Sequence, residues 1–240
     1  MGSVRVSSAF LFFTVVVLWG AISSAFGRRL PVGAGQTHAT VRQAAEVALP
    51  GDTILLQAGN HSPDQFMGNL QGTALAWIVI RGAGDHVAVV SGGSQAWMLE
   101  DPAYLRIENI VFERQTTNGV HLHDGDSYAT AAHHVIFDNC WFRDMAGTGN
   151  NDQIKASGLD SFEVRNCRFL NGAHGGGSGI DMVGCHDGLI TQCHFENMGN
   201  PIQAKGGSRN IQIQRTFFKD ATMRGVNMGG NTDLEYFRPL

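Results

Sequence analysis

The chain has 240 residues, of which 43% are hydrophobic and 16% are charged, with 31 glycines and a formal net charge of −4 at pH 7. This length fits one or two domains, and the hydrophobic share is sufficient for a large core. Charged residues fall below the roughly 25% of ordinary domains, and glycine exceeds its usual share of about 7%. No basic run is present, so charge offers no reason to expect nucleic acid as a partner.

The amino terminus has the pattern of a secretory signal. Arg5 supplies a positive charge, residues 9–22 are an apolar segment too short to span a bilayer comfortably, and residues 23–25 are small. We therefore predict a signal peptide over residues 1–25, with a retained amino-terminal anchor as the alternative. Both interpretations place the mature chain outside the cytoplasm, as a secreted, periplasmic or cell-surface protein. After cleavage no membrane contact is expected.

A polar lead, residues 26–39, precedes a predicted helix that begins at Thr40. Thr40 and Gln43 have the spacing of a capping box. One helix face carries apolar residues, namely Val41, Ala44, Ala45 and Ala48. The Pro-Gly-Asp sequence at residues 50–52 ends the helix, and residues 53–56 follow as a strand. We expect this helix to cap the amino-terminal end of a domain that spans residues 40–240.

A phrase that ends in phenylalanine recurs five times. The copies are residues 105–112, 135–142, 162–169, 188–195 and 211–218. Their final residues lie 30, 27, 26 and 23 positions apart. A second strand phrase, with one polar residue between two apolar ones, follows each copy at residues 120–122, 154–156, 180–182, 202–204 and 226–228. Self-similarity of this period indicates a solenoid whose units must stack to form a core.

These strand phrases are not separated by helices, which excludes a βαβ sheet. The pattern predicts an all-β fold, a single-domain right-handed parallel β-helix. Cys140, Cys167 and Cys193 occupy one position in successive units. Their side chains would point the same way on strands about 4.8 Å apart, which suits buried thiols better than disulfides. Cys185 lies outside this ladder, and its pairing stays open.

A second ladder consists of Asn109, Asn139 and Asn166, continued by Gln192. Stacked amides can bond from coil to coil at a bend. We therefore interpret these positions as structural.

Residues 40–240 resemble the pectin-lyase-like superfamily of right-handed parallel β-helices. The resemblance rests on the phrases TVRQAAEVALPGDTILLQAG and NPIQAKGGSRNIQI and on the IENIVF-type repeat. It implies the fold, whereas the activity stays open because the superfamily includes lyases, hydrolases, isomerases, esterases and adhesins. The polygalacturonase-type hydrolases need clustered aspartates and a Gly-His-Gly turn, and this chain has neither an Asp-Asp pair nor that turn.

Within that superfamily, the QIKASG stretch and the strands after it resemble the alginate-lyase and chondroitinase B family. That resemblance implies a catalytic lysine on such a strand, an arginine on the next coil and acidic calcium ligands. Lys155 matches the lysine. The chain departs from the pattern where Asp181 and Met182 stand near the expected arginine and Gln153 stands at an acidic position.

The second strand phrases place one outward polar residue in each coil. This polar stripe consists of His121, Lys155, Asp181, Gln203 and Asn227. Two residues further along lie His123, Ser157, Val183, Lys205 and Gly229. Long excursions at residues 143–153 and 170–178 flank the stripe. Such a surface suits an extended polysaccharide.

β-Elimination on a uronate needs a base, a cation for the carboxylate and an acid for the leaving oxygen. We assign Lys155 as the base and His121 or His123 as the acid, while Lys205 binds carboxylate. The further substrate-binding candidates are Asp181, Gln203, Asn227 and His174. Asn151, Asp152 and Asp181 could hold calcium through hard oxygen ligands.

Two functions therefore compete. The first is a secreted polysaccharide lyase, and the second is a non-catalytic β-helix that binds glycans or serves as a surface scaffold. The chain reaches Leu240 soon after a strand phrase without a capping element, although terminal repeats normally need one. We expect either end-to-end association of two copies or, preferably, a longer solenoid of which this sequence is a piece.

Overall fold

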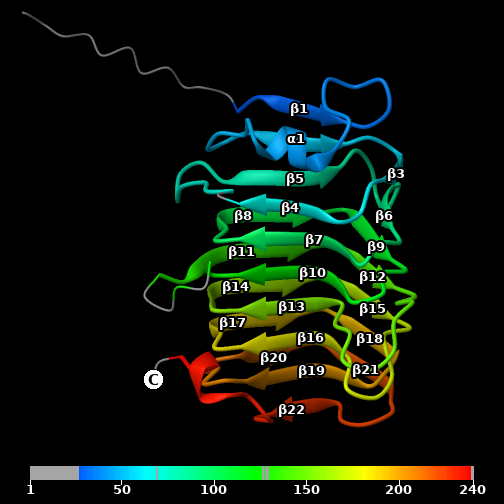
Figure 1. Ribbon diagram of the computed structural model, residues 1–240, viewed down its shortest axis with the longest axis vertical. Coiled ribbons are helices and arrows are strands. Elements are labelled where there is room, and N and C mark those ends of the chain that lie inside the picture. Colours follow the sequence, from blue (N-terminus) through cyan, green and yellow to red (C-terminus); the bar gives the residue numbers. More distant parts are fainter. Residues whose placement is uncertain (1–26, 69, 126, 128–129, 239–240) are drawn as a thin grey trace, which may run out of the picture.

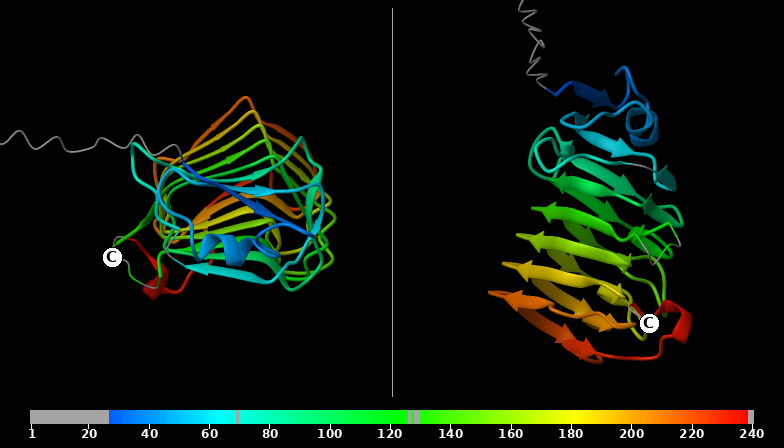
Figure 2. Two further views of the ribbon diagram at one scale, coloured as in Figure 1. Left: turned by 90° about the horizontal axis from the view of Figure 1, so that it is seen from above. Right: turned by 90° about the vertical axis from the view of Figure 1, so that its left-hand side faces the viewer.

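The computed structural model describes residues 27–68, 70–125, 127 and 130–238, so the predicted signal peptide lies outside the described residues. The strands form three parallel sheets that wrap around one core, stacked coil upon coil (Figure 1). Seen from above, the sheets form the sides of each coil (Figure 2). One sheet has eight strands and the other two have seven each.

Sheet A contains β1 (Arg29–Val32), β2 (Thr53–Leu56), β5 (Ile78–Gly82), β8 (Ala103–Glu108), β11 (Ala132–Asp138), β14 (Leu159–Arg165), β17 (His186–Thr191) and β20 (Gln212–Gln214). Sheet B contains β3 (Gly59–His61), β6 (Ala88–Ser91), β9 (Ile110–Glu113), β12 (Trp141–Arg143), β15 (Arg168–Leu170), β18 (His194–Met198) and β21 (Phe217–Ala221). Sheet C contains β4 (Gln65–Gly68), β7 (Gln95–Glu100), β10 (Asn118–His123), β13 (Ile154–Ser157), β16 (Ser178–Val183), β19 (Asn200–Lys205) and β22 (Val226–Met228).

Each complete coil has three strands, whereas the sequence predicted two strand phrases. The phenylalanine phrase divides at its asparagine, as Asn109 separates β8 from β9 with a φ of 60°. This left-handed conformation is one that asparagine tolerates well. The Asn139 amide donates to Asn109 Oδ1 at 2.9 Å, which confirms one step of the predicted amide ladder. The next step differs, because Asn166 donates to Asp138 Oδ1 at 2.8 Å.

A stack of phenylalanines fills the core next to sheet B. Successive ring centroids lie 4.9, 5.1, 4.5 and 5.4 Å apart along Phe112, Phe142, Phe169, Phe195 and Phe218. The first four of these side chains are fully buried. All four cysteines are buried and free, which confirms the predicted ladder of thiols and shows that Cys185 is unpaired as well. The repeated phrase is therefore the framework of the fold.

The amino-terminal coil differs from its prediction in where the sheet starts. β1 lies inside the predicted lead and is the first strand of sheet A, so the parallel sheet begins at Arg29. The helix α1 (Val41–Ala45) has the expected capping box, with the Thr40 side chain accepting from the Gln43 backbone, but it spans only five residues. It packs against β1, β2 and β4. Its role as a cap of the solenoid stays a prediction.

The described residues contain no helix that is long and apolar enough to cross a membrane.

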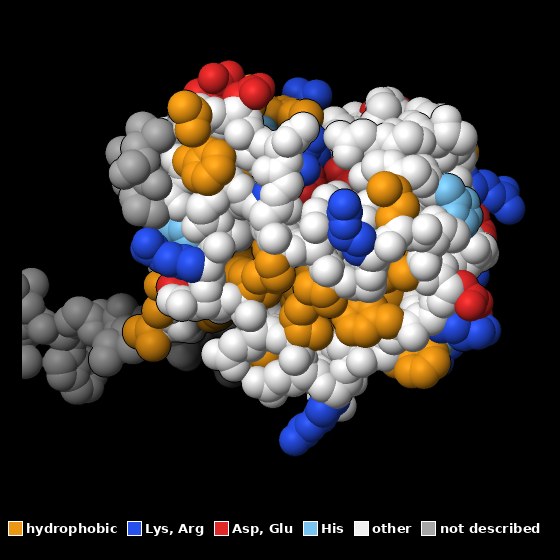
Figure 3. All heavy atoms as spheres, turned by 90° about the horizontal axis from the view of Figure 1, so that it is seen from below, with side chains coloured by type: hydrophobic (Ala, Val, Ile, Leu, Met, Phe, Trp, Pro, Cys, Tyr) orange, Lys and Arg blue, Asp and Glu red, His pale blue; other side chains and the backbone are white. Residues whose placement is uncertain are grey.

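The carboxy-terminal coil exposes several apolar side chains. Phe217 is 54% exposed, Val226 40% and Met228 64%. Seen from below, apolar side chains gather on this end of the solenoid (Figure 3).

A tail of residues 231–238, which contains the 3₁₀ helix η1 (Leu234–Tyr236), turns back from β22 towards earlier coils (red in Figure 1). Arg238 anchors this tail. Its side chain is buried and donates to the Gly184 carbonyl at 3.1 Å and to Asp160 Oδ2 at 2.7 Å.

We expect Phe195→Ala to lower the free energy of unfolding by about 3–5 kcal/mol, the cost of a large buried aromatic-to-alanine change. Phe217, on the outward side of the next strand, is the matched control, and Phe217→Ala should cost about 1 kcal/mol or less. Denaturant unfolding followed by circular dichroism measures both values. Equal losses for the two variants would contradict the assignment of the buried stack as the framework.

Candidate functional site

The predicted polar stripe is present on the outer face of sheet C. Parallel pairing places His121 beside Lys155, Lys155 beside Asp181, and Asp181 beside Gln203. Gln203 is followed by Asn227 on the last strand. The second outward row is present too, with His123 beside Ser157 and Val183 beside Lys205. These side chains come from five different coils, and only the stacking brings them together.

A cavity of about 690 Å³ lies over this face and is called the lysine cavity below. The stripe contributes His121, Lys155 and Asp181 to it, and the second row contributes His123, Ser157, Val183 and Lys205. Its other lining residues are Phe66, Met98, Glu100, Asp124, Asn150, Asn231, Thr232, Asp233 and Tyr236. Asn150 belongs to the long loop of residues 144–153, and the last four residues belong to the tail. Both ends of the sheet C strands are therefore walled.

Three predicted binding residues lie outside the lysine cavity. Gln203 is nearly buried and donates to Ser178 Oγ at 2.5 Å, while its Oε1 accepts from Asn227 at 3.0 Å. These contacts tie neighbouring coils together. His174 is exposed on the loop of residues 171–177, with Nδ1 3.3 Å from Thr222 Oγ1. None of the three is among the described residues that line the cavity.

The floor of the cavity holds a buried ionic cluster. Asp181 Oδ2 lies 3.1 Å from Lys205 Nζ, and the Asp181 side chain is 1% exposed. Asp152 is fully buried, and its Oδ1 accepts from the Ser178 backbone N–H at 2.9 Å. One oxygen of each carboxyl group, Asp152 Oδ2 and Asp181 Oδ1, has no hydrogen-bond partner among the described residues. Orphaned buried oxygens of this kind call for an explanation, such as a bound proton.

Burial, together with the negative charge of Asp181, raises the pKa of Asp152 to about 7, against the lowering effects of Lys155, the Ser178 N–H and Lys205. Desolvation and a like charge both disfavour the ionised carboxylate. Asp152 therefore titrates in the physiological range rather than near pH 4.

The two candidate acids lie together at the upper side of Lys155. The His121 and His123 rings are 5.4 Å apart between centroids, and His123 Nδ1 accepts from the Gly125 backbone at 3.2 Å. This bond fixes the orientation of the His123 ring and leaves Nε2 free to face a ligand. Lys155 and both histidines are partly exposed in the cavity, which gives a bound ligand access to them.

The predicted calcium ligands Asn151, Asp152 and Asp181 are each engaged by protein groups. Asn151 donates its amide to the Thr148 carbonyl at 2.5 Å, and Asp152 and Asp181 face Ser178 and Lys205. Calcium takes six to eight oxygen ligands, so these three side chains would not hold it alone, and calcium binding stays a prediction. Within the described ranges, no three His, Cys, Asp or Glu side chains gather as metal ligands.

Sequence reasoning missed two parts of the cavity. Glu100 and Met98 continue the outward rows on β7, whose QAWMLE phrase has the same alternation as the recognised strands. That signal was available in the sequence. The wall formed by the tail had no such signal, because its position depends on the contact of Arg238 with Asp160, which lies 78 residues earlier.

The chain has the fold of known polysaccharide-acting proteins. It is similar to an alginate lyase from Paenibacillus sp. str. FPU-7, with a TM-score of 0.65 and 21% identity over 82% of this chain and 68% of that one. For a mannuronic acid specific polysaccharide family 6 lyase from human gut microbiota, the TM-score is 0.60 and the identity is 15%, over 75% of this chain and 46% of the other. For the lacto-N-biosidase of Eubacterium ramulus, the TM-score is 0.55 and the identity is 16%, over 74% of this chain and 43% of the other.

The chain thus spans less than half the length of the last two structures. At these identities the likeness establishes the fold. A search of curated protein sequences finds no match. Residues 88–237, which are 150 of the 240 residues, match the family described as the right handed beta helix region. The chain therefore belongs to the right-handed β-helix family, and its parallel solenoid is the fold of that family.

Proposed function

We propose that this protein is a carbohydrate-active β-helix protein that cleaves uronate-containing polysaccharide by β-elimination in the lysine cavity. The observation that carries the proposal is the placement of Lys155 on the cavity floor, between the histidine pair and the Asp181–Lys205 ion pair. The likeness in fold to an alginate lyase and a mannuronic acid specific lyase supports the same class of substrate.

The reaction removes the proton on the carbon next to the sugar carboxylate, breaks the neighbouring bond to the glycosidic oxygen and leaves a carbon–carbon double bond. Lys155 takes that proton as the general base. His121 or His123 gives a proton to the leaving oxygen. Lys205 meets the sugar carboxylate, because an ammonium has three donors and Asp181 engages only one of them.

A lysine that acts as a base must be able to lose its proton. Two ionised carboxylates beside Lys155 would oppose this, since they stabilise the ammonium. We infer that Asp152 and Asp181 hold one proton between them, placed on Asp152 by its raised pKa, which leaves the pair with a single negative charge. Lys205 neutralises that charge at 3.1 Å. Asp152, Asp181 and Lys205 together then carry no net charge, so this cluster does not oppose the loss of a proton from Lys155.

Calcium is the remaining part of the family resemblance. The proposed reaction is carried by side chains of the protein and routes no step through a metal. Calcium binding by Asn151, Asp152 and Asp181 is kept as one arm of the activity assay.

The alternative function is glycan binding without chemistry. One specific observation favours it: the coil after Lys155 presents Asp181, ion-paired with Lys205, where the resemblance implies an arginine. In that case the cavity would hold a sugar chain through the same polar residues but would not cleave it.

The setting of the site completes the proposal. Residues 1–25 direct the chain out of the cytoplasm as a signal peptide, and α1 covers the amino-terminal end of the solenoid. The apolar face of the last coil, with Phe217 and Met228 exposed, associates with a second copy end to end.

Lys155→Met should lower lyase activity by about a hundredfold or more, the usual contribution of general-base catalysis. Activity is followed as ultraviolet absorbance of unsaturated ends on alginate, pectate and chondroitin sulfate, each with calcium and with a chelator. Lys219→Met is the matched control, because Lys219 is an exposed lysine on sheet B. Its activity should equal that of the wild type.

Activity that survives Lys155→Met would overturn the catalytic assignment. A flat trace with every polysaccharide, together with measurable binding by the wild type, would replace the lyase by the glycan-binding function.

The shared proton makes stability depend on pH. The folded-state pKa of Asp152, about 7, lies above its ordinary value of 3.8. Its contribution to stability is therefore present below about pH 4 and is lost as the pH rises through 7. Between pH 5 and pH 8, the free energy of unfolding of the wild type should fall by about 1 kcal/mol or more relative to that of Asp152→Asn, since one pKa unit corresponds to about 1.4 kcal/mol.

Denaturant unfolding at a series of pH values measures this difference. The control is Asp220→Asn at an exposed site, whose curve should run parallel to that of the wild type. Parallel curves for Asp152→Asn and the wild type would show that Asp152 is ionised throughout and that no proton is shared.

A further inference from the structure

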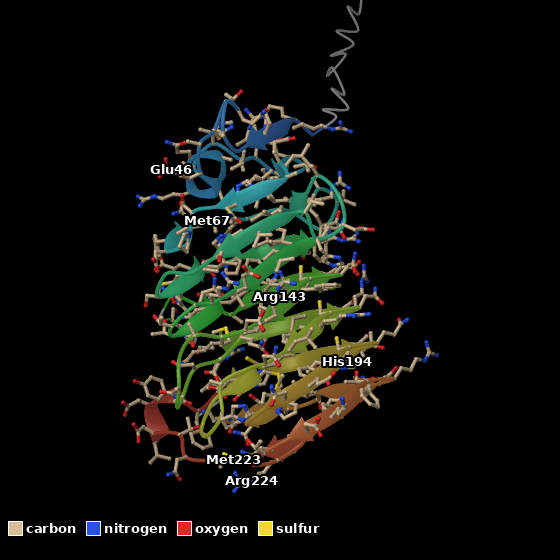
Figure 4. All side chains as sticks on the ribbon, turned by 90° about the vertical axis from the view of Figure 1, so that its right-hand side faces the viewer. Glu46, Met67, Arg143, His194, Met223 and Arg224 are labelled. Atoms are coloured by element: carbon tan, nitrogen blue, oxygen red, sulfur yellow. The ribbon has the colours of Figure 1, made fainter. Side chains whose placement is uncertain are left out.

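The outer face of sheet B carries a column of aromatic and cationic side chains outside the lysine cavity. Strand pairing aligns Trp141 with Arg168, Arg168 with His194, and His194 with Phe217. Each points outward, because the next residue on its strand belongs to the phenylalanine stack of the core. Figure 4 faces this sheet and labels Arg143 and His194.

Trp141 holds Arg168 in position. The His86 ring stacks on Trp141 at a centroid distance of 4.2 Å, and the Arg168 guanidinium lies over the indole at 5.2 Å. His86 is fixed in turn by the Asn139 carbonyl, 3.0 Å from its Nε2. A guanidinium stacked on an aromatic face keeps its five donors directed along its edge. Arg168 is therefore preorganised to bind a planar anion.

The positive charges here are not neutralised by the protein. Within the described part of the chain, neither Arg168 nor Arg215 forms an ion pair, in contrast to Arg143, which pairs with Glu113 at 2.8 Å. The nearby carboxylates have partners already. Glu196 lies 2.9 Å from His194 and 2.6 Å from Lys219.

Two further carboxylates lie at the bend between sheets A and B. Asp138 lies 3.1 Å from Arg165 and accepts from Asn166, while exposed Asp85 faces the Asn139 amide at 3.4 Å. Both are thus engaged by protein groups. The described residues that line the cavity at this bend include two arginines and no carboxylate, so its formal charge is positive.

A cavity of about 470 Å³ opens at this bend, and we call it the arginine cavity. His86, Trp141, Asn166, Arg168, His194 and Arg215 are among its lining residues. This volume is within the range of small-molecule sites. The cavity combines guanidinium donors, amide donors and one aromatic ring, which matches a sugar that carries a carboxylate or sulfate.

We propose that the arginine cavity is a second binding site for the anionic groups of an acidic polysaccharide, held chiefly by Arg168 and Arg215. The choice of polysaccharide rests on the proposed function. The site lies on sheet B and the lysine cavity on sheet C. The arginine cavity therefore holds a polymer chain without taking part in the cleavage.

The test uses the mature chain with Lys155→Met, so that ligands are bound but not cleaved. Defined oligosaccharides of alginate, of chondroitin sulfate and of neutral cellulose are titrated. Calorimetry gives the global signal, and the fluorescence difference between this protein and its Trp141→Phe variant gives the local signal of Trp141, because Trp77 and Trp97 also fluoresce. We expect the acidic oligosaccharides to change the fluorescence and the neutral one not to. The alginate and chondroitin sulfate arms separate carboxylate from sulfate.

Arg168→Met with Arg215→Met should weaken the binding reported by Trp141 by about tenfold or more. Arg209→Met with Arg224→Met is the matched control, because it removes the same charge from exposed arginines outside the cavity. With Lys155 intact, the Arg168 and Arg215 variant should raise KM for a long polymer. Its kcat, and its KM for a short oligosaccharide, should not change.

Unchanged binding by the Arg168 and Arg215 variant, or an equal loss in the control, would overturn the inference. If the wild type cleaves no polysaccharide but the arginine cavity still binds acidic oligosaccharides, the lyase proposal fails while the second site stands. If cleavage occurs but Trp141 reports no binding, the reverse holds.

Discussion

The stacking of equivalent apolar positions from coil to coil is the constraint on which the rest of the structure depends. A single coil is too thin to bury its own inward side chains, so each must use the coil above and the coil below. The phenylalanine stack, with centroids 4.5–5.4 Å apart, is the clearest form of this contact. Because parallel pairing keeps one residue above another, the same register that stacks the phenylalanines also aligns every outward position.

This alignment explains how the fold makes sites without changing its core. The outward residue of a strand can vary freely while its neighbours stay apolar. On sheet C the variation places Lys155 between His121 and Asp181. On sheet B it places Arg168 between Trp141 and His194. The two faces differ in chemistry because sheet C is walled by loops and by the tail, and its carboxylates are consequently buried.

Burial is what gives the sheet C cluster its properties. Two carboxyl groups taken out of water repel each other and lose hydration, so the energetically acceptable state shares a proton or recruits cations. Lys205 forms an ion pair with one oxygen of Asp181. The raised pKa of Asp152 follows from its burial and from the negative charge of Asp181. Gln203 is also nearly buried and bonded to Ser178 and Asn227, so a predicted binding residue is instead a link between coils.

The sequence by itself determined the parallel solenoid, the ladder of three buried thiols and the register of the stripe, because all three depend on a repeat of local patterns that alternation makes visible. It placed the amide ladder at a bend but did not determine that this bend divides each phrase into two strands, since a single residue with positive φ, such as Asn109, leaves the apolar alternation almost unchanged. Only the tertiary structure decided that Asp181 pairs with Lys205 rather than Lys155, that Asp152 is buried beside them and that the tail walls the cavity. These features depend on side-chain directions and on contacts such as Arg238 with Asp160, 78 residues apart, which no local pattern encodes.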